Sequence, residues 1–357
     1  MKNKEYNNFL LRTKDKRLLK FYYKEKVGII YEELIENKII NKKIITKGCL
    51  KYLYVVEDYN RNINLIYQDL IGNIILCTLN SGNLIYSTIF YIKHKFITPI
   101  NIKAILLKDI FFIFYTLDSD STSIYFRNNI NSQSSIIYKE KNDIDINYEV
   151  LYDKEYISLI ILSTSFNMFK IILKTYNIKS NTWLMDKIIF ISNHSYIDSS
   201  FCITDNKIHS LFIINEEGKK LLIYKYNSLE SNRYKQRELN IYEEENLSSC
   251  LILELNNVIY LLWISKNNIY GCYSLDFGES FSRPLIYIDN IEDCSRKIKF
   301  IDEGKIKEIY ISNKNGKFTL FLEELLKYNY SFNIDYKEIT YSTKEKKEIL
   351  QFKKEIF

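Results

Sequence analysis

Residues 201–227 read FCITDNKIHSLFIINEEGKKLLIYKYN. The segment contains three runs of aromatic and β-branched residues, at Phe201–Thr204, Ile208–Ile214 and Lys220–Tyr226. Short polar stretches separate these runs, and Asn215–Gly218 is a glycine-containing turn signal of the hairpin type. A fourth run, Lys235–Tyr242, follows. Together they predict one four-stranded antiparallel sheet.

The same pattern recurs along the chain, because an Asp or Asn in a polar turn repeatedly precedes a compact apolar run. Seven such units follow one another at intervals of about 43 to 52 residues, which is the spacing of propeller blades. The turn residue and the run of each unit are Asp15 with 18–23, Asp58 with 63–67, Asp109 with 110–115, Asp153 with 156–161, Asp205 with 208–213, Asn257 with 258–263 and Asp302 with 306–311.

These units predict an all-β fold, a seven-bladed β-propeller of four-stranded antiparallel blades over residues 1–334. A single sheet of this size exposes apolar residues on both faces, whereas blades packed face to face bury them. An α/β fold would need helical-period stretches of ten or more residues between strands, and almost none occur before Asp335. The first run, Phe9–Arg12, could close the ring together with Ser331–Tyr336.

Residues 335–357 differ from the rest because they are dense in Lys and Glu. Ile349, Phe352 and Ile356 fall at helical spacing, which predicts a short amphipathic C-terminal helix or tail. This segment either docks on the domain or serves self-association or partner recruitment.

Composition and charge limit the function classes. The chain of 357 residues carries a net charge of +6, with Lys and Glu interleaved, so we expect no nucleic-acid partner. The six cysteines are far apart and lie mostly in apolar runs, which predicts no metal site, no cofactor and a reducing, cytoplasmic location. The first residues lack the apolar core of a secretory signal, and no stretch is long and apolar enough to span a membrane.

One motif stands out in the sixth unit. Ser274-Leu275-Asp276-Phe277-Gly278-Glu279-Ser280-Phe281 fits the pattern S-x-D-x-G-x-[ST]-[WF], and a weaker copy occupies residues 78–85. The Asp side chain can accept hydrogen bonds from turn N–H groups, and Gly permits positive φ. We therefore interpret Ser274, Asp276, Gly278, Ser280 and Phe281 as a structural turn.

The motif resembles the Asp box, or BNR repeat, of sialidase-like β-propellers. The resemblance implies the propeller fold over about residues 9–333, and it implies a turn staple on the face away from the active site. An active sialidase would also need three arginines that clamp the substrate carboxylate, one of them in an Arg-Ile-Pro motif. That motif is absent, which predicts a non-catalytic member and no catalytic residues.

We expect any binding site to lie in the loops around the central channel of the propeller. The expected turns between second and third strands are acidic in three units, at Asp69, at Asp118 and Asp120, and at Glu216 and Glu217. Their convergence would suit a basic peptide or a cation, although acidic residues are also ordinary turn formers. The sequence favours a non-enzymatic interaction scaffold for a protein or peptide partner. The alternative is a sialidase-like module that binds or cleaves glycans.

Overall fold

We describe a computed structural model of the chain. It describes residues 5–320 except 16, 36–37, 59, 81–82, 91–98, 108–109, 118–119, 129–133, 141–144, 154, 166–167, 230–235, 290, 292–295, 303–304 and 315–316. The chain divides into two compact units. Unit 1 comprises Met1–Phe166, Lys170–Phe190 and Ile298–Lys307, and unit 2 comprises Asn167–Phe169, Ile191–Lys297 and Glu308–Phe357.

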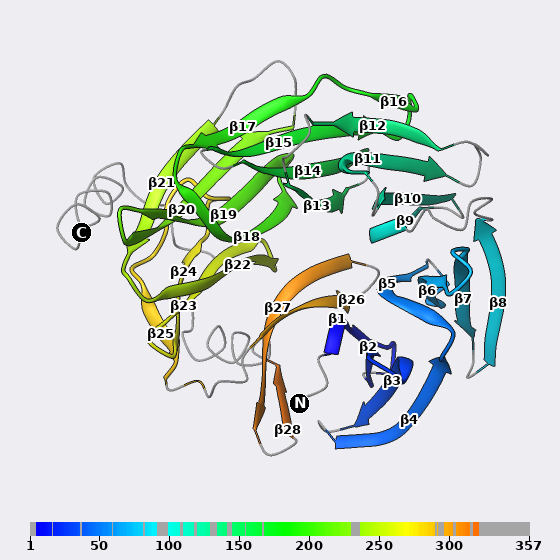
Figure 1. Cartoon of the computed structure of the whole chain (residues 1–357). Helices are drawn as coiled ribbons and strands as arrows, with labels where there is room; N and C mark the ends of the chain where they lie inside the picture. Colours follow the sequence, from blue (N-terminus) through cyan, green and yellow to red (C-terminus); the bar gives the residue numbers. More distant parts are fainter. Residues whose placement is uncertain are drawn as a thin grey trace. The chain divides into compact units, whose positions relative to one another are not determined.

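Every strand that the structure describes belongs to one of six sheets, which we name A to F (Figure 1). Sheet A contains β1 (Glu5–Arg12), β2 (Leu18–Lys24), β3 (Gly28–Ile35), β4 (Lys38–Thr46), β26 (Arg296–Asp302), β27 (Lys305–Lys314) and β28 (Lys317–Leu320). Sheet B contains β5 (Cys49–Glu57), β6 (Ile63–Asp69), β7 (Ile74–Asn80) and β8 (Asn83–Phe90). Sheet C contains β9 (Pro99–Leu107), β10 (Ile110–Leu117), β11 (Asp120–Asn128) and β12 (Ser135–Lys139).

The remaining three sheets follow in chain order. Sheet D contains β13 (Asp145–Tyr152), β14 (Tyr156–Ser165), β15 (Met168–Asn177), β16 (Thr182–Trp183) and β17 (Lys187–Ser192), the last of which pairs with β15. Sheet E contains β18 (Ser195–Thr204), β19 (Lys207–Glu216), β20 (Lys219–Ser228) and β21 (Gln236–Glu243). Sheet F contains β22 (Leu247–Leu255), β23 (Val258–Ser265), β24 (Asn268–Ser274) and β25 (Leu285–Ile288).

This architecture confirms an all-β propeller with four-stranded antiparallel blades, because consecutive strands pair in the order of the sequence. The four runs read from residues 201–242 correspond to β18, β19, β20 and β21, paired in that order. The turn between β19 and β20 is tight, since Glu217 and Gly218 both adopt positive φ, at 50° and 94°. Glycine at the second position takes this conformation without steric cost.

The expected number of blades is wrong, because the described strands form six blades and not seven. The first and seventh repeats share sheet A, in which β1 pairs in parallel with β26 at Phe9–Lys299, Leu10–Phe300 and Leu11–Ile301. Figure 1 shows β26, in orange, beside β1, in dark blue. The second edge of β1 is therefore paired with β26 of the last repeat, whose backbone groups satisfy the N–H and C=O groups of β1.

The expected C-terminal helix is not part of the observed fold. No helix occurs among the residues that the structure describes, and residues 335–357 lie outside them, as do residues 331–336. The boundary after residue 334 and self-association through the tail therefore stay predictions.

Within each unit, the hydrophobic core lies between the faces of neighbouring sheets. The second strands β6, β10, β19 and β23 are buried along nearly their whole length, which explains why they are mostly apolar and do not alternate between apolar and polar residues. In unit 1 one cluster joins residues of sheets A, B and C, and another joins sheets C and D. In unit 2 a third cluster joins sheets E and F and includes Trp263 and Phe281.

The cysteines behave largely as small hydrophobic residues. Cys49, Cys77, Cys250 and Cys272 are free and buried, and Cys202 is free and partly exposed. Burial raises the pKa of the Cys49 and Cys77 thiols to about 11. Across the described residues no helix has the length and apolar character that crossing a membrane requires. The cytoplasmic location stays a prediction.

Candidate functional site

The Asp-box motif forms the turn between β24 and β25. Both oxygens of the Asp276 carboxylate accept hydrogen bonds inside this turn. Oδ1 accepts from the Ser274 hydroxyl and from the Ser280 N–H, each at 2.8 Å, and Oδ2 accepts from the Ser280 hydroxyl at 2.6 Å. The Ser274 hydroxyl oxygen in turn accepts from the Gly278 N–H at 2.8 Å. Asp276 thus organises its own turn, as an Asx-type turn requires.

The turn is anchored in the core by its aromatic end. Phe281 is buried, and its ring meets that of Tyr224 edge to face, with centroids 4.7 Å apart. Gly278 adopts φ of +88°, and a Cβ atom there would collide with the Tyr224 hydroxyl. That hydroxyl contacts Nδ1 of the fully buried His209 at 2.7 Å. Desolvation lowers the pKa of His209 to about 4, so this imidazole is neutral at pH 7.

The acidic turn residues expected at a channel mouth are engaged in local contacts where they are described. Asp69 Oδ1 accepts from the N–H groups of Ile71 and Asn73 at 2.9 and 2.8 Å. Glu216 lies 3.1 Å from Nε2 of His194. Asp69 belongs to unit 1, whereas Glu216 and Glu217 belong to unit 2. Asp118 and the side chain of Asp120 lie outside the described residues. The convergence of these carboxylates therefore stays a prediction.

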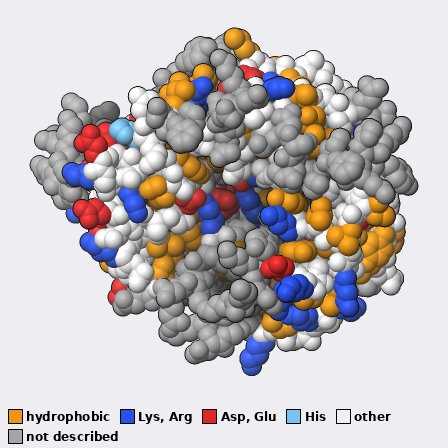
Figure 2. Space-filling model, viewed as in Figure 1, with side chains coloured by type: hydrophobic (Ala, Val, Ile, Leu, Met, Phe, Trp, Pro, Cys, Tyr) orange, Lys and Arg blue, Asp and Glu red, His pale blue; other side chains and the backbone are white. Residues whose placement is uncertain are grey.

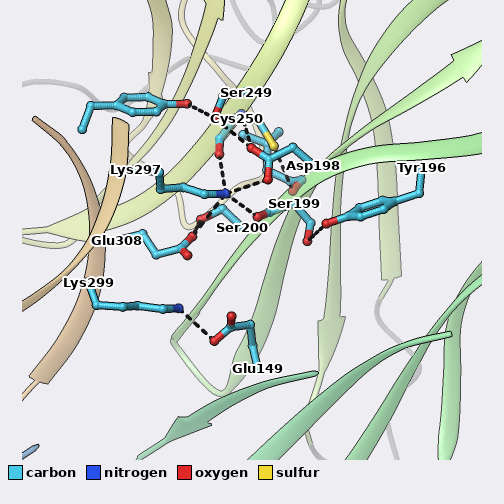
Figure 3. Close-up of polar contacts among 12 residues, drawn as sticks. Glu149, Tyr196, Asp198, Ser199, Ser200, Ser249, Cys250, Lys297, Lys299 and Glu308 are labelled. Atoms are coloured by element: carbon cyan, nitrogen blue, oxygen red, sulfur yellow. Dashed lines mark hydrogen bonds and ion pairs between the residues drawn. The ribbon is translucent and has the colours of Figure 1, made fainter. Parts of the chain in front are cut away.

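The densest polar network in unit 2 surrounds Lys297 on β26 (Figure 3). The Lys297 ammonium lies 2.9 Å from Asp198 Oδ1 and 3.7 Å from Glu308 Oε2. It also donates to the backbone carbonyls of Ser199 at 2.7 Å and Cys250 at 3.3 Å. Burial alone would lower the pKa of Lys297, but the charges of Glu308 and Asp198 hold it above its usual range.

The two carboxylates around Lys297 are tied to the neighbouring strands by hydroxyl groups. Asp198 Oδ2 accepts from the Ser249 hydroxyl at 2.8 Å and from the Cys250 N–H at 3.0 Å. Glu308 Oε2 accepts from the Ser200 hydroxyl at 2.6 Å. We call Lys297, Asp198, Glu308, Ser200 and Ser249 the Lys297 cluster.

Two tyrosines border the Lys297 cluster. The Tyr310 hydroxyl donates to Ser249 Oγ at 3.2 Å, and its side chain is buried. Tyr196 is partly exposed, and its hydroxyl lies 2.8 Å from Ser199 Oγ. Its ring stacks on Phe169 with centroids 4.6 Å apart. The Tyr196 ring is therefore held in place on β18, the strand that also carries Asp198.

Unit 1 contains a separate charged group, which we call the Glu149 triad. Glu149 Oε1 lies 2.8 Å from the Lys103 ammonium, and Oε2 lies 2.8 Å from the Lys299 ammonium. Burial would raise the pKa of the Glu149 carboxyl, but the charges of Lys103 and Lys299 lower it to about 2. The triad links β9, β13 and β26 through side chains.

Sequence reasoning missed both groups because it searched the turns and not the strands. Asp198 and Glu149 lie on the first strands of sheets E and D, in runs that also contain apolar residues such as Ile197, Tyr148 and Val150. A charged residue inside such a run was the available signal, since it must find a partner when its strand is buried. The sequence did not indicate the partner of Asp198, because Lys297 is far from it in the chain.

Figure 2 shows acidic, basic and hydrophobic side chains intermingled on the described part of the face that it draws. Among the described residues, no group of three or more His, Cys, Asp or Glu side chains is placed to hold a metal ion.

Comparisons with known proteins give structural likeness only. No protein family and no curated protein matches the sequence. An ulvan lyase of polysaccharide lyase family PL25, bound to -[GlcA(1-4)Rha3S]-, is 10% identical over 89% of this chain and 93% of its own, with a TM-score of 0.55. The polysaccharide lyase Uly1 is 9% identical over 87% and 88%, with a TM-score of 0.59. A prolyl endopeptidase is 9% identical over 86% of this chain and 46% of its own, with a TM-score of 0.51. These likenesses show the β-propeller fold, and they do not show membership of the Asp-box sialidase-like group.

Proposed function

We propose that this chain is a glycan-binding β-propeller and that the Lys297 cluster, with the Tyr196 ring beside it, is the binding site. The observation that carries the proposal is the partial exposure of two carboxylates in a cluster whose strand β18 also carries the partly exposed Tyr196. The side chains of Asp198 and Glu308 are 22% and 15% exposed, respectively. Carboxylate oxygens accept hydrogen bonds from hydroxyl groups strongly, and an aromatic face packs against the apolar face of a sugar ring.

The charge of the cluster indicates which glycans fit. One ammonium group faces two carboxylates, so the Lys297 cluster is net negative. An acidic sugar would meet repulsion there, whereas a neutral sugar offers hydroxyl donors to the remaining carboxylate lone pairs. We therefore expect neutral glycans to be preferred. Two of the similar structures are polysaccharide lyases, which supports glycans as the ligand class.

The proposal predicts that Asp198→Asn weakens glycan binding about tenfold or more, because a hydrogen bond to a charged acceptor contributes about 1.5–3 kcal/mol. Binding of the full chain to an array of neutral and acidic glycans identifies the ligand, and calorimetric titration gives the Kd of each variant. Asp205→Asn is the matched control, because Asp205 lies in unit 2 at an exposed turn. Absence of glycan binding, or an unchanged Kd for Asp198→Asn, would contradict the proposal.

A basic peptide is the second candidate ligand, and the same net negative charge favours it. A Lys or Arg side chain could pair with Asp198 or Glu308, in keeping with the scaffold function predicted from the sequence. The two candidates differ in their salt dependence. Peptide binding through charge falls steeply between 50 and 500 mM NaCl, on the order of tenfold, whereas binding of a neutral glycan changes little.

A further inference from the structure

The turn between β6 and β7 presents two large apolar side chains to solvent. Leu70 and Ile71 expose 67% and 68% of their surface. Exposed apolar residues are common singly, but two consecutive ones at the tip of a turn place a small convex hydrophobic surface in water.

Hydrogen bonds hold this tip in one conformation. The Asp69 carboxylate accepts from the N–H groups of Ile71 and Asn73, and the Gly72 N–H donates to the Asp69 carbonyl at 3.1 Å. The Gln68 side-chain amide donates to the Gly72 carbonyl at 2.9 Å. Gly72 adopts φ of +102°. Leu70 and Ile71 therefore lie on a turn that its own hydrogen bonds already order, so binding would require little further loss of conformational entropy.

Basic residues surround the tip. The Leu70 N–H donates to the Gly48 carbonyl at 3.2 Å, which places the tip beside the exposed Lys47. Lys51 is also exposed, on β5, whose residue Cys49 pairs with Asp69. Residues 38–56 contain five lysines and no acidic residue.

The neighbouring turn between β2 and β3 adds to this positive charge. Gly28 at its end lies against the backbone of Thr46 and Lys47, and this turn carries Lys24, Glu25 and Lys26. The two turns and the start of β5 therefore carry Lys24, Lys26, Lys47 and Lys51 against the two acidic residues Glu25 and Asp69. We call Leu70, Ile71, Lys47 and Lys51 the apolar-basic tip.

We propose that the apolar-basic tip docks on the surface of an anionic lipid bilayer. Leu70 and Ile71 would enter the boundary between headgroups and acyl chains, while the lysines pair with anionic headgroups. A protein partner or a second copy fits less well. Two convex side chains supply only a few hundred Å², whereas a stable protein interface buries about 1,200–2,000 Å².

Co-sedimentation of the full chain with lipid vesicles tests this proposal. Vesicles of phosphatidylcholine alone are compared with vesicles that also contain phosphatidylserine. The wild-type chain should sediment with the anionic vesicles at least tenfold more than with the neutral ones. Both the double variant Leu70→Ser, Ile71→Ser and the double variant Lys47→Gln, Lys51→Gln should lower the partition coefficient about tenfold. NaCl at 0.5 M should weaken wild-type binding by a similar factor.

The matched control is Leu184→Ser, Met185→Ser, which removes an exposed apolar pair at another edge of unit 1, where Met185 is 89% exposed. This control should bind as wild type does. Thermal unfolding of every variant establishes that the fold is intact. The proposal is overturned by equal sedimentation with both vesicle types, by no sedimentation, or by wild-type binding of the Leu70→Ser, Ile71→Ser variant. It is also overturned if size-exclusion chromatography shows a dimer that this variant converts to a monomer, because the tip then serves a second copy.

Discussion

Gly278→Ala is expected to lower the free energy of unfolding of unit 2 by about 2–6 kcal/mol. Gly278 adopts φ of +88°, which an L side chain rarely takes. The added Cβ would also collide with the Tyr224 hydroxyl and approach Tyr224 Cζ to 2.9 Å. Tyr224 cannot move aside easily, because its side chain is fully buried and its hydroxyl contacts His209. Strain and overpacking therefore act together at this position.

Substitutions at two other glycines distinguish backbone strain from the collision with Tyr224. Gly218 has φ of +94°, and nothing lies within 4 Å of its added Cβ, so Gly218→Ala should cost only about 1 kcal/mol for the backbone. Gly48, in unit 1, has neither feature, so Gly48→Ala should leave the unfolding of unit 2 unchanged. Urea unfolding followed by fluorescence of the buried Trp263, in a Trp183→Phe background, measures the effect in unit 2. Equal losses for Gly278→Ala and Gly218→Ala would show that the collision with Tyr224 does not matter.

The blade unit could be predicted from the sequence because its determinants are local. A second strand such as β19 is buried on both faces and is therefore largely apolar, and the turn that follows it must accommodate positive φ at Gly218. Each blade is a run of consecutive hairpins, so neighbours in the chain are neighbours in the sheet. The residues that determine burial and turn geometry in a blade thus all lie within about fifty consecutive residues.

The number of blades could not be predicted in the same way. It depends on the pairing of Leu10 with Phe300, two residues that stand at opposite ends of the chain. An apolar strand such as β1 has two edges, and its composition does not indicate which distant strand pairs with the second edge. Counting repeats therefore gave seven, whereas hydrogen bonding joins the first and last repeats in one sheet.

The candidate site escaped prediction for a related reason. The Lys297 cluster collects one residue or two from each of β18, β22, β26 and β27. Each of these residues is unremarkable in its own segment, and only the fold brings them within hydrogen-bonding distance. The Asp-box motif was visible because the hydrogen bonds that shape its turn join residues within 273–282, but those bonds stabilise a turn.

Glu149→Gln is expected to destabilise unit 1 by about 2–4 kcal/mol at pH 7, because it leaves two mostly buried lysines without their shared carboxylate. Lys103 and Lys299 have side chains that are only 9% and 22% exposed. Asp186→Asn is the matched control in the same unit. Asp186 pairs with Lys174 at 2.6 Å but is 39% exposed, so its loss should cost less than about 1 kcal/mol.

The pH dependence of stability gives the sharper test of the Glu149 triad. The pKa of Glu149 is about 2 in the folded chain against 4.5 for an ordinary glutamate, so the unfolded chain binds this proton more tightly. The stabilisation is therefore complete above about pH 4.5 and is lost as the pH falls toward 2, by about 3 kcal/mol in all. His209 also makes the chain less stable as the pH decreases, because its pKa of about 4 lies below the ordinary 6.5. This contribution is the same in the wild type and in Glu149→Gln. The difference in unfolding free energy between wild type and Glu149→Gln should hence be constant above pH 4.5 and shrink below it. A difference that stays constant down to pH 2 would mean that the two lysines do not hold the carboxylate in its charged form.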